Sequence, residues 1–125
     1  MEQEYIKGDI VMYDNGIHTI MDTLGVNNYK LSYISHPVHQ LELSGAPLTP
    51  EILSANSFKR VRQDESGALY FKEGLGIDIV ASYVRNCYDI CIRGNRILKG
   101  IEYCHQFQHF LFGLGLKHEM RYNKY

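Results

Sequence analysis

Hydrophobic and polar residues alternate in short runs along the first part of the chain, and turn residues separate these runs. This period of two is typical of half-buried β-strands. An Asn-Gly pair, Asn15-Gly16, lies between the first two runs and is the strongest short-range signal for a β-hairpin. We therefore predict a bent β-meander or a small SH3-like barrel over residues 1–46. Its strands are expected at residues 7–14, 17–24, 29–34 and 38–43.

The pattern changes after residue 46. Thr49 is a suitable N-cap and Pro50 suits the first position of a helix, so a short helix is predicted over residues 47–57. Strand-like runs separated by turn residues then return, and they predict a second, antiparallel β-meander over residues 58–99. Its strands are expected at residues 58–62, 68–72, 77–84 and 87–93.

Apolar side chains recur at helical spacing from Ile101 to Leu114, which predicts an amphipathic helix over residues 100–116. A short strand and a tail are expected over residues 117–125. The sequence contains no internal repeat and no convincing linker, so we predict a single domain, residues 1–125, of the α+β class. In this domain the C-terminal helix packs on the sheet.

The composition is that of an ordinary folded domain. Of the 125 residues, 45% are hydrophobic and 22% are charged, and no stretch approaches the roughly 18 apolar residues that a membrane span needs. The formal net charge is −1, so no strong overall field attracts nucleic acid or an anionic membrane. Residues 1–75 carry six Lys or Arg against ten Asp or Glu, whereas residues 76–125 carry seven against four. Three cysteines and no readable secretory signal predict reduced thiols in a cytoplasmic protein.

Two histidines, His105 and His109, are spaced to lie on one face of the C-terminal helix, where they could share a metal ion with Glu102 one turn earlier. Zinc peptidases need a glutamate directly after the first histidine as general base, and here that residue is Gln106. Hydrolytic zinc chemistry is therefore not predicted. We favour histidines that flank the buried stripe and make hydrogen bonds, with no cofactor. A metal-binding protein is the first alternative.

A second set of candidates is basic and aromatic. Lys59, Arg60 and Arg62 precede Tyr70 and Phe71, and such residues can follow a nucleic-acid backbone and stack on its bases. Tyrosines in strands more often pack across a sheet, however. Weak nucleic-acid binding is therefore the second alternative.

Signatures of common catalytic sites are missing from the sequence. It has no GxxxxGK[ST] loop, no GxGxxG before a helix and no GxSxG elbow. We therefore predict no catalytic residue.

Three stretches resemble a group of small uncharacterised proteins encoded in Bacteroides-type genomes, often in phage or prophage regions. They are KGDIVMY (residues 7–13), PLTPEIL (residues 47–53) and IEYCHQFQ (residues 101–108). The resemblance implies a bacterial cytosol and a phage-derived gene, and it carries over no catalytic residue. Together with the missing catalytic motifs it leads to our main hypothesis, a non-enzymatic binding or accessory module that contacts an unidentified protein partner. The sequence does not indicate an oligomeric state.

Overall fold

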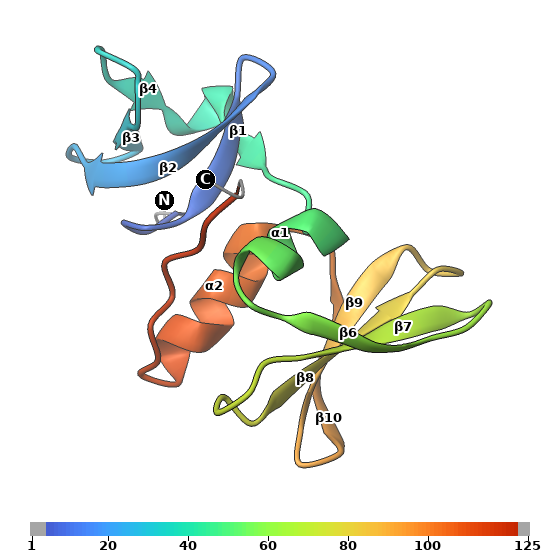
Figure 1. Cartoon of the computed structure of the whole chain (residues 1–125). Helices are drawn as coiled ribbons and strands as arrows, with labels where there is room; N and C mark the ends of the chain where they lie inside the picture. Colours follow the sequence, from blue (N-terminus) through green and yellow to red (C-terminus); the bar gives the residue numbers. More distant parts are fainter. Residues whose placement is uncertain (1–4, 123–125) are drawn as a thin grey trace. The chain divides into compact units, whose positions relative to one another are not determined.

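The structure, a computed structural model, describes residues 5–122 and divides them into two compact units (Figure 1). The first unit joins residues 5–47 to residues 103–122, and the second consists of residues 48–102. Most of the regular structure is β-sheet and one longer helix lies near the C-terminus, so the α+β class is confirmed. Our prediction of a single domain did not include this division. It arises because the C-terminal helix returns to the N-terminal sheet, whereas residues 48–102 form a sheet of their own.

The first unit contains one antiparallel sheet with the strand order β4-β3-β2-β1-β5. The predicted β1–β2 hairpin is confirmed, although its turn lies one residue earlier than expected: Asp14 and Asn15 have φ values of 49° and 63°, and Tyr13 pairs with Gly16. The strands are β1 (Ile10–Tyr13), β2 (Gly16–Thr23), β3 (Asn28–Leu31), β4 (Val38–His39) and β5 (Ser44–Gly45).

The predicted strand at residues 38–43 is wrong beyond His39, because a 3₁₀ turn, η1 (Gln40–Glu42), replaces it. The side chains of His39 and Glu42 cause this change. His39 Nδ1 accepts a hydrogen bond from the Leu41 N–H at 3.1 Å, and Glu42 Oε2 accepts one from the His39 N–H at 3.0 Å. This reciprocal capping favours a helical turn over an extended chain.

The sheet of the first unit encloses a small core in which every member is at most 2% exposed. Its two tyrosines, Tyr5 and Tyr29, meet edge to face with ring centroids 5.8 Å apart. The core consists of Tyr5, Val11, Ile20, Tyr29, Leu31 and Val38.

The helix α2 (Cys104–Gly113) belongs to the first unit and contacts β1, which confirms a C-terminal helix packed on a sheet. It begins four residues later than predicted, because Tyr103 is extended at φ −120° and acts as the N-cap. Residues 117–122 form no strand, so that part of the prediction is wrong. The remainder of the expected tail, residues 123–125, lies outside the described residues.

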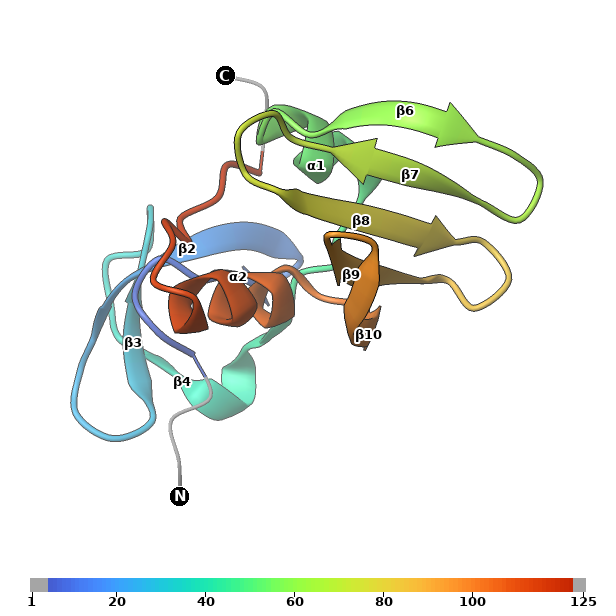
Figure 2. The ribbon, with the colours of Figure 1, turned by 90° about the horizontal axis from the view of Figure 1, so that it is seen from below.

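The second unit is the predicted antiparallel meander, preceded by α1 (Pro50–Ala55) (Figure 2). Thr49 caps α1 as expected, because its Oγ1 accepts a hydrogen bond from the Ile52 N–H at 3.2 Å. The sheet has the order β10-β9-β8-β7-β6, and its fifth strand, β10, extends into the region predicted as helix. The strands are β6 (Lys59–Gln63), β7 (Gly67–Phe71), β8 (Ile77–Ser82), β9 (Cys87–Ile92) and β10 (Asn95–Ile101).

The two faces of the second sheet differ in chemistry. Ala68 and Tyr70 of β7, paired with Ala81 and Ile79 of β8, lie on a buried apolar face that also contains Ile90 of β9. On the opposite face of β9, three side chains are also buried. They are Cys87, Asp89 and Cys91.

Gly67 allows β7 and β8 to approach closely, because a Cβ atom on this residue would overlap the carbonyl oxygen of Ala81. We expect Gly67→Ala to lower the free energy of unfolding by about 3 kcal/mol, since the backbone of β8 must move to admit the methyl group. Denaturant titration of the whole chain measures this change. Gly113→Ala is the matched control, because a Cβ there meets nothing within 4 Å and Gly113 lies in a helix, so stability should hold or rise slightly. Equal unfolding midpoints for the two variants would contradict the argument.

Candidate functional site

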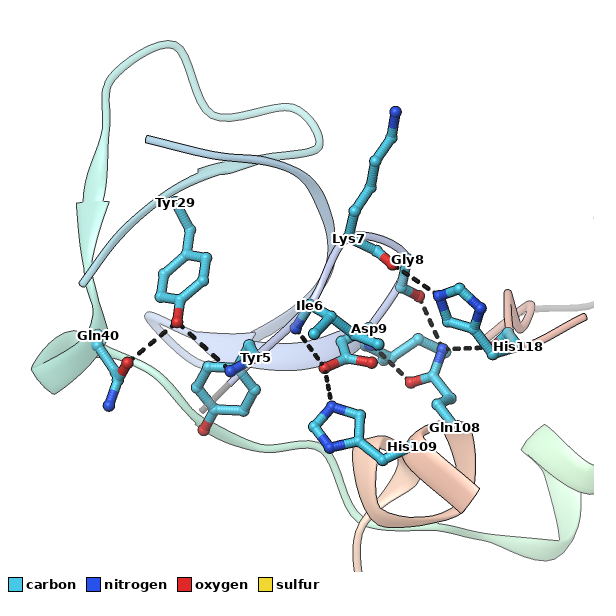
Figure 3. Close-up of polar contacts among 11 residues, drawn as sticks. Tyr5, Ile6, Lys7, Gly8, Asp9, Tyr29, Gln40, Gln108, His109 and His118 are labelled. Carbon is cyan, nitrogen blue, oxygen red and sulfur yellow. Dashed lines mark hydrogen bonds and ion pairs between the residues drawn. The ribbon is translucent and has the colours of Figure 1, made fainter. Parts of the chain in front are cut away.

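Gln108 is a fully buried polar side chain on α2 and connects the helix to the N-terminal segment (Figure 3). Its Oε1 accepts a hydrogen bond from the Ile10 N–H at 2.8 Å, and its Nε2 donates to the Gly8 carbonyl at 2.7 Å. Nε2 also donates to the carbonyl of His118 at 2.9 Å, which ties the segment after α2 to the same point. The amide therefore bonds to the backbone of residues 8 and 10 as a neighbouring strand would.

Next to Gln108, the buried carboxylate of Asp9 pairs with His109 (Figure 3). His109 Nε2 lies 2.6 Å from Asp9 Oδ2, which also accepts a hydrogen bond from the Ile6 N–H at 2.9 Å. Asp9 Oδ1 is buried and has no hydrogen-bond partner. Burial raises the pKa of the Asp9 carboxyl group, although the Ile6 N–H and His109 favour the ionised form.

His105 lies in a cluster of aromatic rings. Its ring stacks on Tyr103 at 5.9 Å and meets the edges of Tyr5 at 5.1 Å and His109 at 5.7 Å between centroids. Gly45 leaves space for this stack, because a Cβ there would lie 2.6 Å from Cγ of Tyr103. Burial, and to a smaller extent the charge of His109, lower the pKa of His105 to about 4, and its buried Nδ1 has no partner.

Of the three residues of the predicted metal site, Glu102, His105 and His109, the structure brings only the two histidines together. His105 and His109 are neighbours on α2, but Nε2 of His109 is already bonded to Asp9. Glu102 is exposed and precedes the helix. Among residues 5–122, no three His, Cys, Asp or Glu side chains form a group that could hold a metal ion.

An Asp–His pair can also orient a histidine for acid–base catalysis. Within the described part of the chain, however, His109 has no hydroxyl or thiol partner that it could activate. Burial raises the pKa of the Cys104 thiol on the same helix to about 12, so this group stays protonated at neutral pH. The pair joins α2 to the N-terminal segment.

The predicted binding residues separate into an exposed and a buried set. Lys59, Arg60 and Arg62 lie on β6, where every residue is exposed. Tyr70 lies opposite Arg60 on β7 but is only 4% exposed, so its ring supports the strand from the buried face. Burial raises the pKa of Tyr70, which keeps its hydroxyl neutral. The structure thus keeps the basic strand as a candidate surface and removes the tyrosine from it.

A polar cluster on β9 was missed by the sequence reasoning. Asp89 is fully buried, and Arg85 and Arg96 both form ion pairs with its Oδ2, at 2.8 and 3.2 Å. The signal was present in the sequence, since an aspartate in the middle of an apolar strand needs a cation or a hydrogen-bond donor beside it. Arg85, four residues earlier, was such a cation.

Comparison with known proteins adds no relationship to this geometry, since no protein-family model, curated protein or solved structure matches the chain. A search of the described residues also found no helix with the length and hydropathy needed to cross a membrane.

We expect Gln108→Leu to lower the free energy of unfolding by about 3–5 kcal/mol, because the buried Ile10 N–H and Gly8 carbonyl would lose their partner. Leucine has a similar volume, so the loss reports on the hydrogen bonds. The matched control on the same helix is Gln106→Leu, which removes an exposed cap bond to the Tyr103 N–H and should cost about 1 kcal/mol. If denaturant titration shows equal losses, Gln108 does not have the role described here.

The lowered pKa of His105 predicts a pH-dependent contribution to stability. A histidine whose folded pKa is about 4 contributes stability that is fully present above its ordinary value of 6.5 and is lost as the pH falls towards 4. His105→Phe keeps the ring and removes the titration. We expect the stability of the original chain relative to this variant to fall by about 2 kcal/mol between neutral pH and pH 4, allowing for solvent screening.

Denaturant titrations of both proteins at each pH check this difference. The raised pKa of Asp9 has the opposite effect, because its protonation favours the folded state as the pH falls. Both proteins contain Asp9, so this effect cancels when their stabilities are compared. A difference that stays constant with pH would show that His105 titrates normally.

Proposed function

We propose that the protein is a non-enzymatic binding module and that β6 of the second unit binds an extended, acidic segment of a partner protein. The observation that carries this proposal is the position of β6 at the end of the sheet order, with all five of its residues exposed. Within residues 5–122 no further strand pairs with its outer side. An edge strand of this kind presents unpaired N–H and C=O groups to a partner segment.

The charge on β6 selects the kind of partner. Lys59, Arg60 and Arg62 place three cations on five residues. Two copies of this strand would repel each other, whereas acidic side chains on an added strand would lie close to these cations. Val61, between the two arginines, is 57% exposed and offers an apolar contact at the same edge.

The burial of Tyr70 favours a protein partner over nucleic acid. Single-stranded nucleic acid is bound by cations together with aromatic rings on which its bases stack. On this strand pair the ring of Tyr70 is buried, so of the two predicted rings only Phe71, which lies opposite Lys59, is exposed for stacking. A backbone-paired peptide needs no row of exposed rings.

The remaining expectations belong to the same proposal. An SH3-like barrel for the first unit is supported by its bent five-stranded sheet with the order β4-β3-β2-β1-β5. The bacterial and phage-derived origin rests on the sequence resemblance alone and stays a prediction. The cytoplasmic location rests on the cysteines and the missing secretory signal as well, and it also stays a prediction. Metal binding through Glu102, His105 and His109 also stays a prediction, without a further observation in its favour.

The test is fluorescence anisotropy of the whole chain with a labelled peptide of alternating glutamate and valine. We expect saturable binding that weakens with added salt, and much weaker binding of a peptide of alternating lysine and valine. Arg60→Gln with Arg62→Gln should weaken binding about tenfold, because two charge-assisted contacts are lost. The matched control, Arg93→Gln with Lys99→Gln, removes two exposed cations elsewhere in the second unit and should bind as the original chain does.

A backbone variant separates strand pairing from simple charge attraction. The Asp64 N–H donates to the Gly67 carbonyl, and ladder bonds alternate, so the N–H of Gln63 points away from β7. Gln63→Pro removes this outward donor and should also weaken binding. Equal affinity for both peptides, or for all variants, would refute the proposed function.

A further inference from the structure

Asp89 holds two arginines of the second unit in fixed positions. Its Oδ1 accepts a hydrogen bond from the Gly100 N–H at 2.9 Å. Its Oδ2 accepts from Nη2 of Arg85 at 2.8 Å and lies 3.2 Å from Nε of Arg96. Both guanidinium groups therefore meet at one oxygen atom of a carboxylate that is itself fully buried.

The charges of this cluster do not balance. Desolvation of Asp89 is outweighed by the Gly100 N–H and the two arginines, so the pKa of its carboxyl group lies below the usual value and the group stays ionised. Two cations thus share one anion. Within the described part of the chain, neither arginine has another acidic partner within 4 Å. The side chains of Arg85 and Arg96 are 52% and 47% exposed, so the excess positive charge faces solvent.

The backbone on both sides of the cluster is also fixed. The N–H of Arg85 donates to Oγ of Ser82 at 3.2 Å in the β8–β9 turn, and Arg96 pairs with Cys91 in the β9–β10 ladder. The two side chains lie on the same face of the sheet, because Cys91 and Asp89 share that face. Little conformational entropy would be lost if both guanidinium groups bound one ligand.

We propose that Arg85 and Arg96 form a binding site for a phosphate group, with Asp89 as the positioning residue. Each guanidinium uses one nitrogen on Asp89, which leaves Nε and Nη1 of Arg85 and both terminal nitrogens of Arg96 as donors. Paired planar donors of this kind match the oxygen atoms of a phosphate, which has enough oxygen atoms to accept hydrogen bonds from both guanidinium groups at once. The site does not depend on the proposed role of β6, because β9 and β10 lie at the other end of the sheet.

The test is a titration of the whole ¹⁵N-labelled chain, followed by NMR, with inorganic phosphate at constant ionic strength. The Gly100 N–H and the arginine Nε–H groups bond to Asp89 or flank it, so their signals report on the site. We expect saturable shifts of these signals with phosphate and none with chloride. O-phosphoserine and adenosine monophosphate distinguish the sources: tighter binding of either one names a phosphorylated side chain or a nucleotide, and equal binding of all three names free phosphate.

Arg85→Lys with Arg96→Lys keeps both charges near Asp89 and removes the planar donors, so phosphate affinity should fall about tenfold. Arg93→Lys, on the neighbouring turn, is the control and should leave affinity unchanged. If the double variant does not fold, Arg96→Gln alone leaves the Arg85–Asp89 pair in place and should give the same loss. The absence of saturable shifts, or equal affinity in a folded variant, would overturn the proposal.

Discussion

The first unit depends on one side-chain amide. Gln108 bonds to the backbone of Gly8, Ile10 and His118, so one side chain joins two segments that lie far apart in the sequence. A buried amide can be retained only if its donors and acceptor are all satisfied, because each unpaired group would cost free energy. Satisfying them fixes the position of α2 against β1, and this position in turn brings His109 to Asp9. The packing of the helix and its polar contacts therefore depend on each other. The apolar side chains of α2 bury it against β1, and the hydrogen bonds of Gln108 fix its position along that strand.

Local chemistry explains which elements the sequence predicted. Some elements depend only on residues that are close in the sequence, and these were predicted. They include the cap at Thr49, the hairpin turn near Asn15 and the alternation in β7 to β9. The start of α2 was misjudged because Ile101 continues the helical spacing, although it pairs with Tyr88 in the sheet. Whether Ile101 joins a strand or a helix depends on a strand partner more than ten residues away. The spacing of apolar residues over a short window carries no information about that partner.

The candidate sites show the same limit of sequence reasoning. The histidine pair on α2 was found by its spacing, but its partner Asp9 comes from the other end of the chain. The cations of β6 were found as a cluster, whereas the burial of Tyr70 depends on which face of the sheet meets the core. The pair of Arg85 and Arg96 was missed because Arg96 reaches Asp89 only through the pairing of β10 with β9. Spacing predicts which residues share an element, and only the pairing of elements shows which residues meet.

Asp89 also explains why the two edges of the second sheet differ. The ladder between β9 and β10 shifts register twice, and Gly100 adopts a φ of +73° beside the second shift. The bond from its N–H to Asp89 holds the strand in this irregular path. Such bulges turn the backbone of an edge strand away from further pairing. β6 has a single register shift, at Val61, and its positive charge opposes pairing with a second copy of the same strand. Charge repels a second copy of the same strand but attracts an acidic one, so the charge that opposes self-pairing at β6 also suits the acidic partner that we propose.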